Sequence, residues 1–193
     1  RYRLVVKPAE AYGTQPTVAA PESLMPTSIG NLTSFTAAKG YYTDRIELAP
    51  MVEEIFEDIM PLAEKKGITL ECEGDGVLTG SDTLIYRLIF NLTENAIRYN
   101  RPGGTVRITV TEEGSELVIR VIDTGCGIPA QYRESIFQPF FRVEQSRSRA
   151  YGGVGLGLAL VWEIAALHGG RVAAEQSDET GTTMAVRLPA GRE

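Results

Sequence analysis

The stretch that most constrains the fold is LIYRLIFNLTENAIRYN, residues 84–100. At about 100° per residue its apolar side chains fall on or beside one stripe: Ile85, Leu88, Ile89, Leu92 and Ala96. This pattern predicts a helix that buries one face. Asn91 and Asn95 are four residues apart and share one flank of the stripe. They fit either a solvated helix edge or a cleft in which amide oxygens help to hold a magnesium ion carrying phosphate oxygens.

Composition limits the classes of function. A chain of 193 residues predicts one domain of ordinary size with a segment left over. The net charge of −6 argues against a nucleic-acid surface. The longest apolar run, Val154–Trp162, is far shorter than a membrane span. Cys72 and Cys126 lack metal-ligand spacing, and the N-terminus lacks a signal-peptide pattern, which together favour a reducing compartment. We therefore predict a cytoplasmic domain without membrane contact, which can still be part of a membrane protein.

Residues 1–40 contain four prolines and no sustained period, so we expect an irregular segment or linker in which RYRLVV forms one short strand. The ordered domain is expected at 41–193. Its first elements are a strand at RIEL and a helix that has Pro50 in its first turn and ends at Gly67, with a possible kink at Pro61. ITLEC and VLTG then predict strands joined by a glycine turn. Ser81 or Asp82 is expected to cap the asparagine helix.

A hairpin follows, with strands at TVRITVT and ELVIRVID and a turn over 112–115. Leu117, Ile119 and Val121 share one face of the second strand, and Asp123 continues that face. A carboxylate in this register costs several kcal/mol to bury unless a donor satisfies it. A purine exocyclic amine is a suitable donor, and an Asp that caps the next turn is the ordinary alternative.

The next segment, DTGCGIP, has glycines that permit close backbone approach to a ligand, and Pro129 is expected to open a short helix that ends near Ser135. From residue 136 to 153 the chain carries aromatic residues and arginines and has little period. A connection this long is unusual in a compact domain and is often functional. We expect a mobile lid over 138–152 that an anionic ligand orders, with Arg142, Arg147 and Arg149 as its cations.

The glycine-rich run YGGVGLGLALVWEIAALHGG predicts a helix whose N-terminus offers bare amides to an anion. Neither common glycine motif fits, because Leu158 stands where a dinucleotide fingerprint needs glycine and where a P-loop needs lysine. Gly169 and Gly170 end the helix, and a final strand pair follows at RVAAEQS and TTMAVRLP.

Four motifs in this order resemble the catalytic ATP-binding domain of bacterial sensor histidine kinases, in the superfamily of gyrase, Hsp90 and MutL. They are NLTENAIRYN, DTGCGIP, IFQPFFR and GVGLGL, and the resemblance covers about residues 45–189. It implies a two-layer α/β (α+β) sandwich of the Bergerat type, in which a mixed sheet of about five strands has helices on one face. It also implies ATP and magnesium as ligands, a phosphoacceptor histidine domain and a response regulator as partners, and a cytoplasmic position.

The resemblance also implies roles for particular residues. Asn95 would hold magnesium with Asn91 assisting, Arg98 would face phosphate, and Tyr99 would flank the base. Asp123 would accept from the adenine amine. Arg142 belongs to the lid and is implied, with Asn91, Asn95 and Arg98, in catalysis. The remaining nucleotide-binding positions line the pocket or form the phosphate loop: Gly125, Gly127, Ile128, Phe137, Gly153, Gly155, Leu156, Gly157 and Leu158.

Departures from the family leave alternatives open. Cys126 occupies a variable place in the first glycine motif and is either an inert small residue or a thiol that nucleotide protects. Asn91 stands near where ATP-hydrolysing relatives carry a glutamate, which favours a kinase. His168, the only histidine, lies in the last helix, where it is expected to interact with the helix C-terminus. The acceptor histidine is therefore expected on another domain. The alternatives are a stand-alone serine kinase of the anti-sigma type and a degenerate domain in which ATP only sets conformation.

Overall fold

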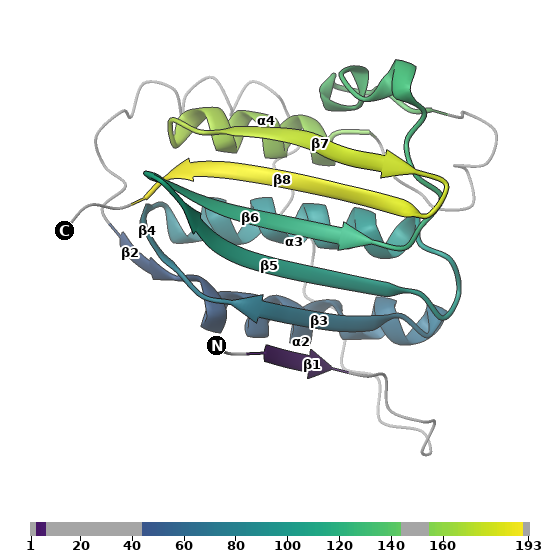
Figure 1. Ribbon diagram of the computed structural model, residues 1–193, viewed down its shortest axis with the longest axis horizontal. Coiled ribbons are helices and arrows are strands. Elements are labelled where there is room, and N and C mark those ends of the chain that lie inside the picture. The colour runs from purple at the N-terminus through teal and green to yellow at the C-terminus, as the bar shows by residue number, and fades with distance from the viewer. Residues whose placement is uncertain (1–2, 7–43, 144–154, 191–193) are drawn as a thin grey trace.

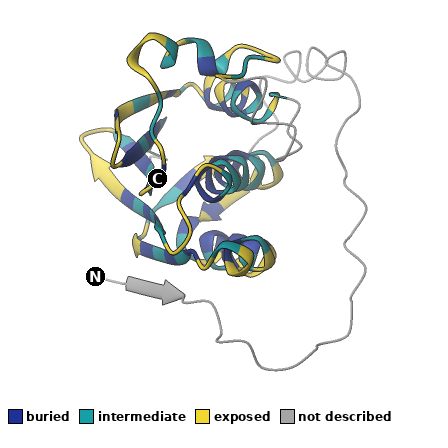
Figure 2. Cartoon of the chain, turned by 90° about the vertical axis from the view of Figure 1, so that its right-hand side faces the viewer, coloured by how far each residue is buried: buried dark blue, intermediate teal, exposed yellow. Residues whose placement is uncertain are grey.

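The computed structural model describes residues 3–6, 44–143 and 155–190. Its main feature is a six-stranded mixed sheet in the order β1-β3-β5-β6-β8-β7. The helices α2, α3 and α4 lie side by side on one face of this sheet (Figure 1), and the view in Figure 2 shows them as a separate layer. The predicted α+β sandwich with helices on one face is confirmed.

The sheet combines one parallel pairing with antiparallel ones. β3 pairs with β5 in parallel, whereas β5–β6, β6–β8, β7–β8 and β1–β3 are antiparallel. Five strands come from the ordered domain, and the short strand expected at the N-terminus adds a sixth at the edge of β3. The bounds are β1 Arg3–Val6, β3 Thr69–Gly74, β5 Thr105–Glu113, β6 Glu116–Asp123, β7 Arg171–Asp178 and β8 Gly181–Pro189.

The strands predicted on either side of the glycine turn are present but lie in different sheets. β4 (Val77–Gly80) pairs with β2 (Asp44–Glu47) in a separate two-stranded sheet. The Asp75 carboxylate accepts hydrogen bonds from the backbone N–H of Gly76 at 2.7 Å and of Ala49 at 3.1 Å. These bonds turn the chain toward the start of α2 and away from β3, both of whose edges are already paired.

Helix α2 spans Leu48–Lys66 and continues through Pro61. Gly67 ends it with φ 67°, a left-handed conformation that glycine adopts without steric cost. Helix α3 spans Asp82–Arg98, and the apolar stripe predicted for it is buried. Ser81 is its N-cap residue, but the Ser81 side chain makes no capping hydrogen bond, so the side-chain cap expected there is not formed.

Helix α4 spans Gly157–Leu167 and follows the glycine run as predicted. The helix expected from Pro129 to Ser135 was wrong in form. Two 3₁₀ turns stand there instead, η2 at Ala130–Tyr132 and η3 at Ser135–Phe137. The backbone bonds here run from residue i+3 to residue i, as from the Tyr132 N–H to the Pro129 carbonyl and from the Gln138 N–H to the Ser135 carbonyl. Residues 144–152 of the predicted lid lie outside the described residues.

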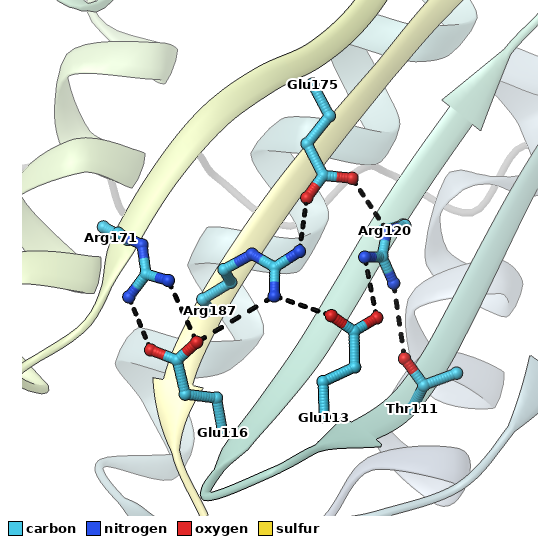
Figure 3. A network of polar contacts seen from close by, with 7 residues as sticks. All are labelled: Thr111, Glu113, Glu116, Arg120, Arg171, Glu175 and Arg187. Atoms are coloured by element: carbon cyan, nitrogen blue, oxygen red, sulfur yellow. Dashed lines mark hydrogen bonds and ion pairs between the residues drawn. The ribbon is translucent and has the colours of Figure 1, made fainter.

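The sheet face opposite the helices carries a network of alternating charges (Figure 3). Arg187 bridges Glu113 and Glu175, with N–O distances of 2.7 and 2.6 Å. Arg120 contacts the same two carboxylates at 2.8 and 2.9 Å. Arg171, Glu116 and Thr111 extend the network. An antiparallel sheet covered on one side is expected to present polar side chains to water on the other.

Candidate functional site

The asparagine pair on α3 is the first part of the site. Asn91 Nδ2 donates to the backbone carbonyl of Arg87 at 2.7 Å, so this carboxamide is oriented by its own helix. The bond leaves Asn91 Oδ1 as the acceptor that points away from the helix. Within the described ranges, the carboxamide of Asn95 makes no hydrogen bond. Both groups are half-buried, and their oxygens are the hard, neutral ligands that magnesium accepts.

The N-terminus of α4 lies against this pair. A Cβ atom placed on Gly157 would stand 3.1 Å from Asn91 Oδ1 and 3.8 Å from Asn95 Nδ2. A side chain at this position would crowd the Asn91 carboxamide, so glycine permits the close approach. Amide groups at the start of a helix attract anions. The two predicted features, the asparagine flank and the glycine-started helix, therefore meet in space.

Asp123 ends β6 and is half-buried. Its Oδ1 accepts from the backbone N–H of Gly125 at 2.8 Å and of Thr182 at 3.2 Å. Burial raises the pKa of the carboxyl group, and the two backbone hydrogen bonds oppose that shift. Within the part of the chain that the structure describes, no donor reaches Oδ2, which is free to accept from a ligand.

Gly125 joins Asp123 to the end of α3. A Cβ on Gly125 would lie 2.5 Å from the Tyr99 carbonyl oxygen and 2.8 Å from Asp123 Oδ1, so the chain passes there only without a side chain. The N–H of Cys126 donates to the same Tyr99 carbonyl at 3.3 Å. The Asn95 carbonyl in turn accepts from the Tyr99 N–H, so the loop after Asp123 is held against the end of the helix that carries Asn95.

Other predicted positions take different surroundings. Arg98 forms an ion pair with Glu94 at 2.7 Å. Tyr99 is 52% exposed at the end of α3, and Leu156 is 37% exposed before α4. Ile128 donates its N–H to Ser177 Oγ at 2.7 Å, which fixes the chain after Gly127. Phe137 and Leu158 pack against the core as half-buried residues.

The predicted lid over 138–152 is described only at its start, residues 138–143. The Phe140 N–H donates to the Gly155 carbonyl at 2.9 Å, so the segment leaves and re-enters the fold at neighbouring points. Arg142 is half-buried near this junction. Gly153, Arg147 and Arg149 lie outside the described residues, and the predicted mobility of the lid stays a prediction.

Three contributors had no role in the sequence analysis. Thr182 donates to Asp123, and the buried hydroxyl of Ser177 contacts Thr182 Oγ1 at 2.8 Å and accepts from Ile128. Lys66 donates to carbonyls at the end of α3. Ser177 and Thr182 gave no clear signal, because they stand among several polar and hydroxyl residues around the turn between the last two strands. Lys66 gave no signal, because its partners are backbone atoms of another helix.

No group of three or more His, Cys, Asp or Glu side chains in the described ranges is placed to hold a metal ion. Likewise, none of the described helices is both long and apolar enough to cross a membrane.

Comparison with known families matches residues 80–192 to the Histidine kinase-, DNA gyrase B-, and HSP90-like ATPase family. The chain belongs to this family. The match contains both asparagines, Asp123 and the start of α4, so the family assignment covers the surface described above. The chain therefore has the fold of this ATPase family.

The relatives of this ATPase-family chain include sensor histidine kinases. RppB of Synechocystis sp., a sensor histidine kinase, is 37% identical over 145 residues, which cover 74% of this chain and 32% of RppB. The sensor-like histidine kinase SenX3 of Mycolicibacterium smegmatis is 36% identical over 149 residues, covering 76% of this chain and 38% of SenX3. The chain thus spans about a third of the length of these relatives.

Solved structures of histidine kinases share the fold. The catalytic domain of ThkA superposes with a TM-score of 0.65 at 26% identity, covering 76% of this chain and 96% of that domain. Full-length ShkA in complex with AMPPNP superposes with a TM-score of 0.70 at 21% identity, covering 84% of this chain and 35% of ShkA, which is a likeness of fold alone.

Proposed function

We propose that residues 41–193 are the catalytic domain of a two-component sensor histidine kinase. The domain binds magnesium–ATP and presents the terminal phosphoryl group to a histidine on a separate phosphoacceptor domain, which in turn serves a response regulator. The observation that carries the proposal is the approach of Gly157 at the start of α4 to Asn91 and Asn95. Asp123 adds a carboxylate oxygen that is free to accept from a ligand within the described residues. The sensor histidine kinases among the relatives support it.

The residues present fit the nucleotide and its metal. Asp123 Oδ2 would accept from the adenine amine, and exposed Tyr99 would flank the base. The amide oxygens of Asn95 and Asn91 would help to hold magnesium, and the α4 N-terminus would contact phosphate. Arg98 and Arg142 would add positive charge, Arg98 at the expense of its pair with Glu94.

Catalysis in this arrangement is positioning and charge compensation, because phosphoryl transfer needs little covalent chemistry from the protein. Bound magnesium would supply neutralisation of phosphate charge. The asparagine carboxamides would orient the phosphates from α3, and the glycine-started helix would hold them from the other side. The imidazole nucleophile would come from outside this chain.

His168 does not fit the role of acceptor. It follows the last residue of α4, whereas the candidate phosphate site lies at Gly157, the first residue. The intervening helix is about 16 Å long at 1.5 Å per residue. An acceptor must approach the phosphorus within about 3–3.5 Å. Since α4 is packed into the core, no local movement closes the gap.

Two experiments test the proposal. Calorimetry should detect magnesium–ATP binding to the chain, with weaker binding after Asn95→Ala. Incubation with radiolabelled ATP should leave the chain itself unlabelled but should slowly label a separately produced phosphoacceptor domain of the same parent protein, since the reaction lacks tethered effective concentration. The label should be acid-labile and base-stable, as for phosphohistidine.

Three outcomes would contradict parts of this proposal. Absence of ATP binding would remove it altogether. Label on His168 in the isolated chain would overturn the assignment of the acceptor to another domain. Acid-stable label on a serine of an added protein would support a serine kinase of the anti-sigma type.

A further inference from the structure

The His168 side chain joins two helices through both of its ring nitrogens. Nε2 accepts a hydrogen bond from the backbone N–H of Ser81 at 3.1 Å. Nδ1 lies 2.8 Å from the carbonyl oxygen of Ile164, in the last turn of α4. A carbonyl oxygen can only accept and an N–H can only donate, so the two contacts together select the neutral tautomer with its proton on Nδ1.

The contact with Ser81 replaces a hydrogen-bond acceptor that the residues at the start of α3 do not provide. In a capping box, a Glu or Gln side chain at the third helical position accepts from the N–H of the N-cap residue. The N-cap here is Ser81 and the third helical position is Leu84, which has no polar atom to offer. The imidazole of His168 therefore supplies, from another helix, the acceptor that the capping box lacks.

The position of His168 relates to the candidate nucleotide site through the packing of α3 and α4. The end of α4 meets the start of α3 at His168 and Ser81, while the start of α4 meets Asn91 at Gly157. The two helices are therefore antiparallel, with the histidine contact at one end of the pair and the site at the other. Sliding of α4 along α3 would change both contacts together.

Gly80 shows how closely the ring is held. A Cβ on Gly80, the last residue of β4, would stand 2.7 Å from His168 Cδ2 and 2.9 Å from Nε2. The ring thus lies between β4 and α4 with no space for even one methyl group. Its position is fixed by packing as well as by hydrogen bonds.

We propose that His168 is a positioning residue for the nucleotide pocket: by accepting from Ser81 it sets the axial position of α4, and with it the distance of Gly157 from the two asparagines. This inference rests on the proposed function, because it assigns the residue to the same pocket. It predicts that nucleotide affinity depends on a side chain at position 168 that accepts from the Ser81 N–H, whether or not that side chain is an imidazole.

Two variants separate the two hydrogen bonds. In His168→Gln, the amide oxygen occupies the place of Nε2 and can accept from Ser81. In His168→Asn, the shorter side chain reaches only the place of Nδ1 and can donate to Ile164. Glu163→Gln, an exposed change on the same helix, is the matched control. Calorimetric titration with magnesium–ATP is done well below the unfolding temperature of every variant.

We expect His168→Gln and Glu163→Gln to keep the wild-type affinity for magnesium–ATP. His168→Asn should bind it on the order of fivefold more weakly, which is the size of effect that mutations transmitted through packed side chains produce. NMR of the nucleotide-free chain provides a second readout. Imidazole nitrogen shifts should report Nδ1 protonated and Nε2 accepting, and the Ser81 amide proton should move in His168→Asn but not in His168→Gln.

Equal affinity in all variants would overturn the positioning role while leaving the proposed function in place. Equal losses of affinity in His168→Gln and His168→Asn would overturn it as well. So would an NMR result that places the proton of the His168 ring on Nε2. Failure of the wild-type chain to bind magnesium–ATP would instead remove the proposed function, and the NMR tautomer measurement would still decide whether the Ser81 contact exists.

Discussion

Lys66 Nζ donates a hydrogen bond to the backbone carbonyl of Ile97 at 3.2 Å. The same ammonium group contacts the carbonyl oxygens of Arg98 and Asn100, so the last residue of α2 binds the end of α3. Helix ends carry carbonyls without partners and a partial negative charge, and a cation satisfies both. Partial burial lowers the pKa of Lys66, as expected for an ammonium group drawn between two helices.

Lys66→Met should therefore destabilise the fold by about 1–2 kcal/mol, because it removes a helix-end cation and leaves carbonyls without their donor. Urea unfolding of the wild type and the variant measures the loss. Lys65→Met, an exposed change next to it on the same helix, is the control and should have little effect. Equal effects of the two variants would show that the carbonyl contacts contribute nothing.

Asp123→Asn should weaken ATP binding without lowering stability. The amide keeps an oxygen for Gly125 and Thr182 but turns an NH₂ group toward the adenine amine. Loss of a hydrogen bond to a charged group costs about 1.5–3 kcal/mol, or about tenfold to a hundredfold in affinity.

The stability half of this prediction follows from the sign of the pKa shift. Burial raises the pKa of Asp123 above its ordinary 3.8, so the folded chain binds this proton more tightly than the unfolded chain. The charged carboxylate therefore costs stability once the pH exceeds its folded pKa. At pH 7, Asp123→Asn should unfold at the wild-type temperature or above it; a large drop would mean that the carboxylate supports the fold.

The two thiols should differ in reactivity. Burial raises the pKa of Cys72 to about 11, and its side chain is only 1% exposed. Cys126 is exposed in the loop that follows Asp123. Since the thiolate is the reactive form, a thiol reagent at pH 8 should modify the folded chain once, at Cys126. Mass spectrometry checks the site, Cys126→Ser should abolish labelling, and slower labelling with ATP would place the thiol beside the nucleotide.

Acid should weaken the network on the open sheet face. Hydrogen bonds from arginine guanidinium groups lower the pKa of three carboxyl groups: Glu113, Glu116 and Glu175. A glutamate with a lowered folded pKa stabilises the fold above its ordinary pKa of about 4.5 and loses that contribution as the pH falls through the folded pKa. The unfolding temperature should thus decrease as the pH is lowered from about 5. The decrease should be less steep in Arg187→Gln and at high salt. A profile unchanged by Arg187→Gln would contradict this explanation.

Local patterns were sufficient for most of the fold. The 3.6-residue period of α3 and the alternation in β5 and β6 predicted elements that the structure confirms, because burial of one face dictates both patterns. The alternation also placed Asp123 at the edge of the core. What adjacent sequence could not show was pairing between distant segments: β4 joins β2 rather than β3, and β1 extends the main sheet.

In the candidate site, too, local features could be predicted from the sequence and contacts between distant segments could not. The carboxamides and the glycine helix were visible in sequence, but their contact at Gly157 depends on how α4 packs on α3. The contributions of Thr182 and Lys66 escaped notice because both act through hydrogen bonds to or from backbone atoms. Nearly every residue carries a backbone N–H and a carbonyl, so these contacts leave no mark in composition or spacing.

The charge network of Figure 3 also affects the electrostatic field that a charged partner meets as it approaches the domain. Its ionic members are three glutamates and three arginines, so their formal charges cancel on that face. The chain as a whole carries −6. The surplus negative charge therefore lies on residues outside this network. Opposite charges that alternate over a few ångströms produce little field beyond a Debye length of about 8 Å in physiological salt. Electrostatic steering of a charged partner would then act through charged residues outside the network, and the network itself would contribute little.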